Sequence, residues 1–421
     1  MKLFRRPQLA SWFPQLSYQV WLLAFGRLLS QVGSGFTLFY APIFFVNQVG
    51  LSATSVGLGL GSASISGVVG RVFGGSLSDA AFGRKRTVLL SAGISAIAAV
   101  VLAATLNFPM FVLGNLLMGF GVGLYWPSTE AMVADMTGPE QRNEAFALNR
   151  LSDSLGLGVG VVLGGLLIST TGAYRLLFVV DGISFVVLFA VVYWAIVEPK
   201  HVTGKHALAT GWRIALSDRQ LLTYAVVNVL FTTYIVQTSS ALPLFFSNFV
   251  VVSPTAPGFS SVIISALFTW HLLLAAISQL PIARALNRFS RCQALILSAS
   301  LWGSGFACVW WTGVTSVAHL IWAALALTIL AMATVTYMPA ASSLVVDLAP
   351  ESLRGVYLAA NSQCWAIGYF IGPLLGGWAM DQSPPIARGY WLVLAMTIFG
   401  AIAILQVLNR MMNRIDILGQ K

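Results

Sequence analysis

The sequence predicts an all-α membrane protein with twelve transmembrane helices in two pseudo-symmetric six-helix halves. Three observations support this fold class: the composition, the length of the apolar runs and an internal repeat. Of the 421 residues, 57% are hydrophobic and only 9% are charged, whereas a soluble domain carries about 25% charged residues. The apolar runs reach the length of about 20 residues with which a helix spans the hydrocarbon core while satisfying its own backbone hydrogen bonds.

The apolar runs place six helices before a polar stretch and six after it. The first run follows Lys2, Arg5 and Arg6, and it is too long for the apolar core of a signal peptide, so we expect an uncleaved first helix. The first-half helices are expected near 17–46, 53–77, 87–106, 110–134, 144–169 and 174–197. The second-half helices are expected near 220–250, 259–284, 292–313, 316–345, 354–380 and 388–409. The predicted units are therefore an N-terminal half at 1–197, a cytoplasmic linker at 198–219 and a C-terminal half at 220–421.

The distribution of lysine and arginine predicts the orientation. The segments expected in the cytoplasm carry most of the basic residues, from Lys2 to Lys421, whereas the opposite loops carry only Arg175 and Arg388. Positive charge marks the cytoplasmic side of a membrane protein. We therefore expect a multi-pass protein of the bacterial inner (plasma) membrane with both termini in the cytoplasm. The net charge of +10 is dispersed among short loops, which argues against nucleic acid as a partner.

An internal repeat relates the two halves. A shift of 212 positions aligns GLYWPSTEAMVADM (123–136) with VTYMPAASSLVVDL (335–348), so that Tyr125 matches Tyr337 and Asp135 matches Asp347. The matches fall mostly on glycine, proline and polar residues, which a shared apolar composition does not bring into alignment. Repeated halves with a substrate site between them near the midplane are typical of secondary transporters.

The segment GGSLSDAAFGRKR (74–86) closes the second helix and turns into the third. It resembles the signature loop of the major facilitator superfamily, and the whole chain resembles the bacterial drug and multidrug efflux members of that family. It departs from the pattern because three residues separate Asp79 from Gly83 and because Ala80 replaces a basic residue. The resemblance implies a cytoplasmic latch at Asp79, the alternative being a solvated loop that only sets topology. The implied signature-loop and inner-gate residues are Arg71, Gly75, Asp79, Gly83, Arg84, Lys85 and Asp135.

Two related turns, DMTGPEQR (135–142) and DLAPESLR (347–354), join helices on the cytoplasmic side. Each begins with an aspartate and ends with an arginine, so we expect Asp135 to bridge to Arg142 and Asp347 to Arg354. The pattern does not separate a structural clamp from a gate.

Two glycine-rich stretches, GLGVGVVLGG (156–165) and GYFIGPLLGG (368–377), place small residues four apart, which favours close helix packing. They resemble the superfamily's antiporter motif, although Val161 replaces the proline in the fifth helix. Export is favoured on this ground. Asn115 stands where the family has an arginine linked to proton transfer, which puts the usual proton-coupling assignment in doubt. The predicted packing residues are Gly156, Gly160, Gly164, Gly165, Gly368, Gly372, Pro373, Gly376 and Gly377.

Ionisable residues inside the helices should face a cavity or a partner, since a charge at the bilayer centre is costly. We expect Arg150 and Asp153 to form an intramembrane ion pair, because they lie three apart on one helix. Glu130 is the candidate proton-coupling group, with pairing to Arg71 or Arg150 as its alternative. Asp181 lies nearer the outside, in the sixth helix. The substrate-cavity and coupling candidates are Arg27, Tyr40, Tyr125, Trp126, Glu130, Gln237 and Tyr337, although aromatic stripes on apolar helices are more often packing.

The sequence carries no nucleotide-binding loop, metal cluster or activated nucleophile, and its three scattered cysteines form no disulfide framework. We therefore expect neither an enzyme nor a cofactor or metal. The expected partners are a small-molecule substrate, a proton as coupling ion and the lipid bilayer, with the protein a monomer. The functional hypothesis is a secondary active transporter that exports a small amphiphilic compound by alternating access. Two alternatives stay open: an importer of a sugar, organic acid or other metabolite, and a transporter-like sensor or assembly factor.

Overall fold

The fold is taken from a computed structural model that describes residues 16–79, 82–137, 142–197, 213–251, 258–286, 288–350 and 354–419. Every regular element within these ranges is a helix. The side chains of Asp79, Arg142 and Arg354, which begin or end helices, lie outside the described part. The same holds for most of the predicted linker, because the described chain resumes at Arg213.

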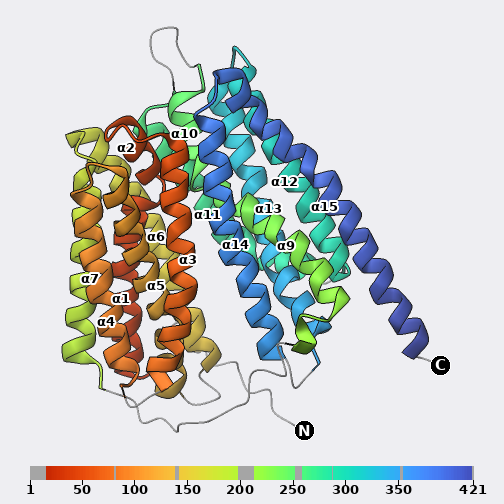
Figure 1. The fold of residues 1–421 in the computed structure, drawn as a ribbon, viewed down its shortest axis with the longest axis horizontal. Coiled ribbons are helices and arrows are strands. Elements are labelled where there is room, and N and C mark those ends of the chain that lie inside the picture. The colour runs from red at the N-terminus through yellow and green to blue at the C-terminus, as the bar shows by residue number, and fades with distance from the viewer. Residues whose placement is uncertain are drawn as a thin grey trace, which may run out of the picture.

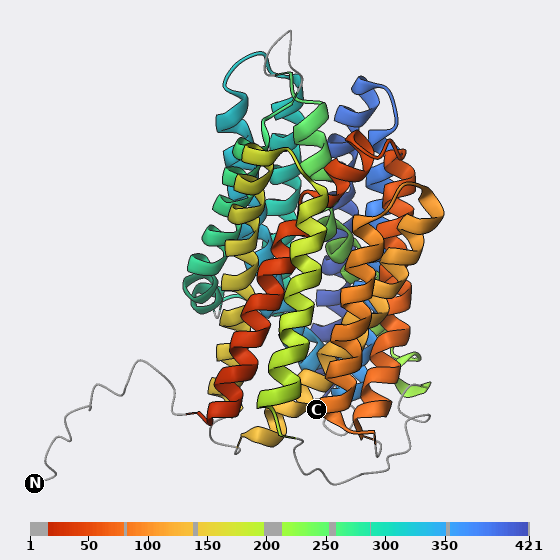
Figure 2. The ribbon, with the colours of Figure 1, turned by 90° about the vertical axis from the view of Figure 1, so that its left-hand side faces the viewer.

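Helices α1 to α7 pack together as one group (Figure 1). Their bounds are α1 Tyr18–Leu38, α2 Ala41–Asn47, α3 Ala53–Asp79, α4 Arg84–Ala103, α5 Phe108–Met136, α6 Arg142–Thr171 and α7 Arg175–Ala195. Helix α1 packs on α6 and α7, whereas α5 packs on α3 and α4. In Figure 2 this group faces the viewer, with α1 and α7 crossing its surface.

Helices α9 to α15 form the second group. Their bounds are α9 Arg219–Gln237, α10 Ala241–Asn248, α11 Ser261–Leu286, α12 Arg291–Val314, α13 His319–Leu348, α14 Arg354–Met380 and α15 Pro384–Gly419. Helix α14 packs on α9 and α12 packs on α13 and α15. The helices begin and end within a few residues of their predicted positions, except that α15 runs on to Gly419.

Two predicted single spans, 17–46 and 220–250, are each broken into a long and a short helix. The first break falls at Phe39–Tyr40 and the second at Thr238–Ser240. Pro42 and Pro243 lie just after these breaks, and proline cannot donate the backbone hydrogen bond that would continue the preceding turn. A proline therefore accompanies a change in chain direction at corresponding places in both halves.

Eleven helical stretches of the described chain are long and apolar enough to cross a membrane. Helix α14 is 27 residues long but is not one of the eleven. Its glycines and the polar run Asn361–Gln363 lower its mean hydropathy. The all-α membrane fold is thus confirmed, and the count of twelve spans stays a prediction.

The two groups of helices meet at one end and diverge toward the other (Figure 1). We call the end that carries α2 and α10 the closed end, and the end where α1 begins and α15 finishes the termini end. At the closed end α3 lies directly on α14: a Cβ added at Gly57 would lie 2.0 Å from the carbonyl oxygen of Pro373. This contact is backbone against backbone.

Glycines also set the helix contacts within each half. A Cβ at Gly156 would lie 2.4 Å from the carbonyl oxygen of Leu28, and one at Gly160 would lie 2.1 Å from that of Val32. Helix α14 repeats the arrangement, because a Cβ at Gly368 would lie 2.1 Å from the Thr232 hydroxyl of α9. Small residues let helices approach where lipid provides no hydrophobic driving force.

Adding one methyl group to α6 tests this packing. We expect Gly160→Ala to destabilise the protein by about 1–3 kcal/mol, the usual cost of overpacking. Gly158→Ala is the matched control, since its Cβ would meet nothing within 4 Å. That control should be neutral or stabilising by about 0.5–1 kcal/mol, because glycine weakens a helix. Thermal unfolding of the purified variants measures both, and equal melting temperatures would contradict the packing assignment.

Candidate functional site

A cavity of about 860 Å³ lies between the two halves. It runs from Leu60, on the side of the closed end, to Arg71, Glu130 and Arg150, which lie within a few turns of the termini end. Helices α3, α5 and α6 supply one wall and α14 supplies the other. Its lining residues are Leu60, Ala63, Ser64, Gly67, Arg71, Met118, Gly119, Val122, Gly123, Trp126, Pro127, Glu130, Arg150, Ser362, Trp365, Ala366 and Tyr369. We call this the central cavity.

Three exposed charged side chains, Arg71, Glu130 and Arg150, line the central cavity. Glu130 lies open on the cavity wall, in agreement with the expectation that an ionisable residue inside a helix faces a cavity or a partner. Glu130 shares this cavity with Arg71 and Arg150, the two arginines that were expected as its alternative partners. A carboxylate in that position can meet water, a proton or a substrate directly.

The predicted ion pair between Arg150 and Asp153 is wrong. Asp153 pairs instead with Arg27 of α1, whose Nε donates to Asp153 Oδ1 over 3.0 Å. Although Arg150 and Asp153 lie three residues apart, Arg150 points into the central cavity and Asp153 points toward α1. The side chain of Arg27 is only 4% exposed, so this buried pair fixes α1 against α6.

Arg27 is therefore a structural anchor in this conformation and does not line the central cavity. Its guanidinium lies 5.1 Å from the ring centroid of Trp126 and 5.6 Å from that of Tyr125. Trp126 in turn lines the central cavity, whereas Tyr125 is buried beside it. The anchor thus holds one cavity-lining aromatic side chain in place.

The other three cavity candidates, Tyr40, Gln237 and Tyr337, are fully or almost fully buried and do not line the central cavity. Tyr40 donates to the carbonyl oxygen of Val161 over 3.4 Å. Gln237 Nε2 donates to the Gly372 carbonyl oxygen over 2.8 Å and to the Tyr390 hydroxyl over 2.7 Å. These side chains hold helices together.

Tyr337 belongs to a buried polar network in the second half. Its hydroxyl donates to Asn228 Oδ1, and Asn228 Nδ2 donates to Asn361 Oδ1 over 2.8 Å. The Tyr224 hydroxyl donates to the same Asn361 oxygen over 3.2 Å. The network joins α9, α13 and α14, so it supports the α14 wall of the cavity from behind.

Sequence reasoning missed the residues that α14 contributes to the central cavity. Trp365 and Tyr369 lie four residues apart on one face of this helix, with their ring centroids 5.8 Å apart. That spacing is visible in the sequence. Tyr369 lies within the glycine motif 368–377, which was interpreted as a packing motif.

At the termini end, two ion pairs occupy corresponding places in the two halves. Arg84 at the start of α4 pairs with Asp135 near the end of α5. Arg291 at the start of α12 pairs with Asp347 at the end of α13, with 3.3 Å between Nε and Oδ2. Both aspartates therefore bond back to the preceding helix, and Arg291 was not predicted. The expected bridges to Arg142 and Arg354 involve side chains outside the described part.

The remaining signature-loop residues serve different purposes. Gly83 has a φ of 89°, which a side chain would disfavour, and it caps α4. Lys85 donates to the carbonyl oxygen of Tyr193 over 2.9 Å. Gly74 approaches α5 closely, whereas a Cβ at Gly75 would meet nothing within 4 Å, so packing does not require a glycine there. The side chain of Asp79 lies outside the described part.

The last glycines of the two repeated motifs join the halves at the closed end. A Cβ at Gly165 would lie 2.3 Å from Ser265 Cβ on α11, and one at Gly377 would lie 2.1 Å from the Ala53 carbonyl oxygen on α3. The motif thus serves packing inside each half and between the halves. Pro373 lies at the same crossing, beside Gly57.

A polar latch, which the sequence analysis did not identify, covers the glycine crossing at the closed end. The Asp381 carboxylate accepts hydrogen bonds from the backbone N–H groups of Ala53 and Thr54, over 2.6 and 2.7 Å. It caps the first turn of α3 from the other half, where a carboxylate is favoured. Asn47 and Asn248 also exchange side-chain hydrogen bonds across the halves, over 2.9 and 2.8 Å.

A second cavity of about 260 Å³ lies between the central cavity and the closed end. We call it the Asp181 chamber. Leu60, Met118, Val122 and Tyr369 line both cavities and so form the partition between them. The chamber draws its walls from both halves. Its other lining residues are Ser34, Thr37, Leu38, Ala41, Pro42, Phe45, Leu102, Phe111, Asn115, Phe178, Asp181, Val236, Ser239, Ser240 and Pro373.

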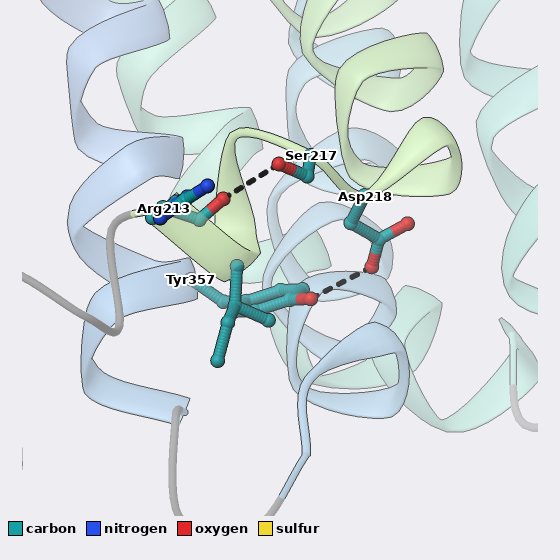
Figure 3. A pocket seen from close by; sticks show the side chains of 5 residues that line it. Arg213, Ser217, Asp218 and Tyr357 are labelled. Atoms are coloured by element: carbon teal, nitrogen blue, oxygen red, sulfur yellow. Dashed lines mark hydrogen bonds between the residues drawn. The ribbon is translucent and has the colours of Figure 1, made fainter.

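A third hollow, lined by Arg213, Ile214, Ser217, Asp218 and Tyr357, lies at the base of α9 (Figure 3). Its hydroxyl groups and its carboxylate have partners: the Tyr357 hydroxyl donates to Asp218 Oδ2 over 2.7 Å, and the Ser217 hydroxyl donates to the Arg213 carbonyl oxygen over 2.8 Å. Asp218 also caps α9 by accepting from the backbone N–H of Gln220 over 2.8 Å. These bonds tie the start of α14 to the start of α9, which is a structural role.

A family model described as Major Facilitator Superfamily matches residues 23–251 and 243–411. The chain belongs to the major facilitator superfamily. It is therefore a multi-pass membrane transporter by family, and this family is not one of enzymes. The resemblance given by the signature loop and the repeat is confirmed.

Curated relatives carry the name multidrug resistance protein MdtH. The protein of that name from Salmonella arizonae is 27% identical over 362 residues, which cover 84% of this chain and 84% of that protein. The one from Escherichia coli is 26% identical over 345 residues, covering 80% of this chain and 81% of the relative.

Solved structures of transporters share the fold at lower identity. A peptide transporter POT in complex with sulfate superposes with a TM-score of 0.76 at 15% identity, covering 96% of each chain. The nucleoside transporter NupG gives a TM-score of 0.77 at 13% identity, covering 93% of this chain and 99% of that one. Likeness at this identity establishes the fold alone.

The Arg27–Asp153 pair predicts that Asp153→Asn lowers the free energy of unfolding substantially. Asp153→Asn leaves the buried guanidinium without its anion, which costs about 3–5 kcal/mol in a fully buried pair. Because Asp153 is 17% exposed, we expect the lower end of that range. Thermal unfolding provides the measurement, with Arg150→Gln as the exposed control that should change it little. The pairing is refuted if Arg150→Gln is the more damaging of the two.

We expect Asp381→Ala to weaken the latch and so to increase the fraction of molecules in which the two halves separate at the closed end. Hydrogen bonds to a charged group contribute about 1.5–3 kcal/mol each, so we expect the loss of two of them to raise the population of the opened form about a hundredfold or more. The measurement is the labelling rate of Ser240→Cys by a membrane-impermeant maleimide, in a background without the native cysteines. Ser240 lies in the Asp181 chamber and is buried.

Gln382→Ala serves as the matched control for the latch, since the Gln382 side chain donates to Trp378 of its own half. It should leave the labelling rate near that of the parent. An Asp381→Ala rate equal to the control would show that the glycine crossing alone keeps this end closed.

Proposed function

We propose that this protein exports a small amphiphilic compound in exchange for protons, by alternating access between its two halves. The observation that carries the proposal is the central cavity. Its wall combines the aromatic side chains Trp126, Trp365 and Tyr369 with the ionisable residues Arg71, Glu130 and Arg150. Pockets for small molecules are mostly apolar, with a few polar groups that fix orientation.

The architecture supports alternating access. The closed end is held by contacts that cross between the halves, at Gly57, Gly165 and Gly377, and by the Asp381 latch. The halves diverge toward the termini end, where the described ion pairs stay inside one half. Rocking of the halves about the central cavity would exchange which end is open. The basic termini-end segments favour a cytoplasmic location for that end, so this conformation faces inward, in the inner membrane of a bacterium.

Glu130 is the proposed proton-coupling group. Its carboxylate lies exposed on the wall of the central cavity beside Arg71 and Arg150. A proton and a substrate that both bind there compete, and this competition is the simplest physical basis of exchange. The names of the multidrug resistance relatives favour export over import. We propose that the protein works as a monomer.

One observation favours a second candidate, the transport of an organic anion. The central cavity presents two arginines, Arg71 and Arg150, against one glutamate, Glu130. This leaves one net positive charge, which suits a carboxylate or a phosphate group. A polar metabolite of this kind corresponds to the importer hypothesis from the sequence.

Reconstituted vesicles with an internal pH indicator separate these functions. We expect a lipophilic compound from a panel of cations, drugs, sugars and organic acids to drive proton movement. Glu130→Gln should reduce that movement to background while retaining the fold. Ser64→Ala is the control, because Ser64 lines the same cavity without a charge and should keep most of the signal.

Two results would contradict the proposal. A signal with organic acids alone would support the anion transporter, and Arg71→Gln should then abolish it. No movement of any compound under any ion gradient would favour the transporter-like sensor or assembly factor.

A further inference from the structure

The Asp181 chamber contains a buried carboxylate that no described residue neutralises. Asp181 lines the chamber and is only 3% exposed. Its Oδ1 is buried and has no hydrogen-bond partner among the described residues. The described ion pairs of the same half join Arg27 to Asp153 and Arg84 to Asp135. A charge inside the membrane without a partner is costly, so this carboxylate needs either a proton or a cationic ligand.

The local backbone is built to admit this carboxylate. A Cβ at Gly33 of α1 would lie 2.7 Å from Asp181 Oδ1 and 2.2 Å from the Ser184 hydroxyl. Any other residue at Gly33 would displace the carboxylate. Ser184 donates to the Asp181 backbone carbonyl oxygen over 2.7 Å, which leaves the side-chain oxygens of Asp181 for something else.

Three aromatic rings also line the chamber. Phe45 contacts Phe111 with ring centroids 4.2 Å apart and Phe178 with centroids 5.3 Å apart, and all three rings line the chamber. Aromatic faces attract ammonium groups, and such clusters recognise quaternary ammonium ligands. A chamber that holds both a carboxylate and an aromatic cluster is suited to an organic cation and poorly suited to an anion.

The position and the size of the chamber agree with a substrate subsite. Its volume of about 260 Å³ is just below the range of about 300–1,000 Å³ for ligand pockets. It holds a head group or a small molecule. Tyr369 and Met118 belong to the partition with the central cavity, so a larger body can extend past them when these side chains move.

We propose that the Asp181 chamber is a binding subsite for the ammonium group of an organic cation, with Asp181 as its counter-ion and Phe45, Phe111 and Phe178 as its aromatic wall. The inference rests on the proposed transport of an amphiphilic compound, whose substrate class it narrows. Asp181 acts here as a specificity-determining residue, distinct from the coupling role proposed for Glu130.

Binding of benzyltrimethylammonium and of neopentylbenzene tests the subsite, because these probes differ only in a nitrogen or a carbon at the branched centre. We would titrate the purified full-length protein by calorimetry and subtract titrations of protein-free micelles. The wild type should bind the cation about tenfold or more tightly than the neutral probe. Asp181→Asn should remove that preference and leave the affinity for neopentylbenzene unchanged.

Asp347→Asn is the charge-matched control, since Asp347 is an exposed carboxylate at the termini end and its loss should leave the preference intact. A wild type that binds the two probes equally, or an Asp181→Asn protein that keeps the preference, overturns the proposal. In either case Asp181 holds at most a proton.

A second measurement needs no variant and covers the case in which Asp181→Asn fails to fold. A hydrophobic carbodiimide should label Asp181 in the wild type, as read by mass spectrometry, and benzyltrimethylammonium should slow that labelling where neopentylbenzene does not. Equal protection by the two probes would count against the subsite. Both experiments run without an ion gradient, so loss of proton-coupled export in vesicles would refute the proposed function while leaving the cation preference measurable.

Discussion

The structure depends above all on backbone contact at glycine. Inside a bilayer the lipid is as apolar as leucine, so helices associate where small residues let their backbones touch. Here one repeated glycine motif makes such contacts both within each half and between the halves. Gly156 and Gly160 fix α6 on α1, which brings Arg27 within reach of Asp153. Gly165 and Gly377 then join the halves at the closed end. The two cavities lie in the space that these contacts leave.

The fold was largely predictable from the sequence, because long apolar runs and a repeat at 212 positions are one-dimensional signals. The breaks after Leu38 and Gln237 were not predicted. Both Pro42 and Pro243 were visible, but each lies inside a continuous apolar run, so the run length masked the turn. The weak apolar character of α14 comes from its glycines and from Asn361 and Gln363, whereas the residues with which it lines the central cavity are Ser362, Trp365, Ala366 and Tyr369.

The candidate site was predictable only in part. Trp126 and Glu130 line the central cavity, as the sequence analysis expected, whereas Arg71, which was expected at the inner gate, lines it as well. Partner choice was not predictable, since a helix register gives neighbours along one helix but says nothing of which helix packs opposite. Asp153 therefore paired with Arg27 and not with Arg150. The Asp381 latch was even harder to predict, because its hydrogen-bond donors are backbone N–H groups, which no residue type reveals.

Mutation affects the two sides of the Asp381 latch differently. The carboxylate is encoded by a single codon, whereas its two donors are main-chain amides that every residue except proline supplies. Substitutions other than proline at Ala53 and Thr54 thus leave the latch in place. Its strength changes mainly through substitution of Asp381. A transporter built this way can adjust how long it dwells in one orientation by one substitution far from the groups that contact its cargo, so turnover and selectivity can evolve separately.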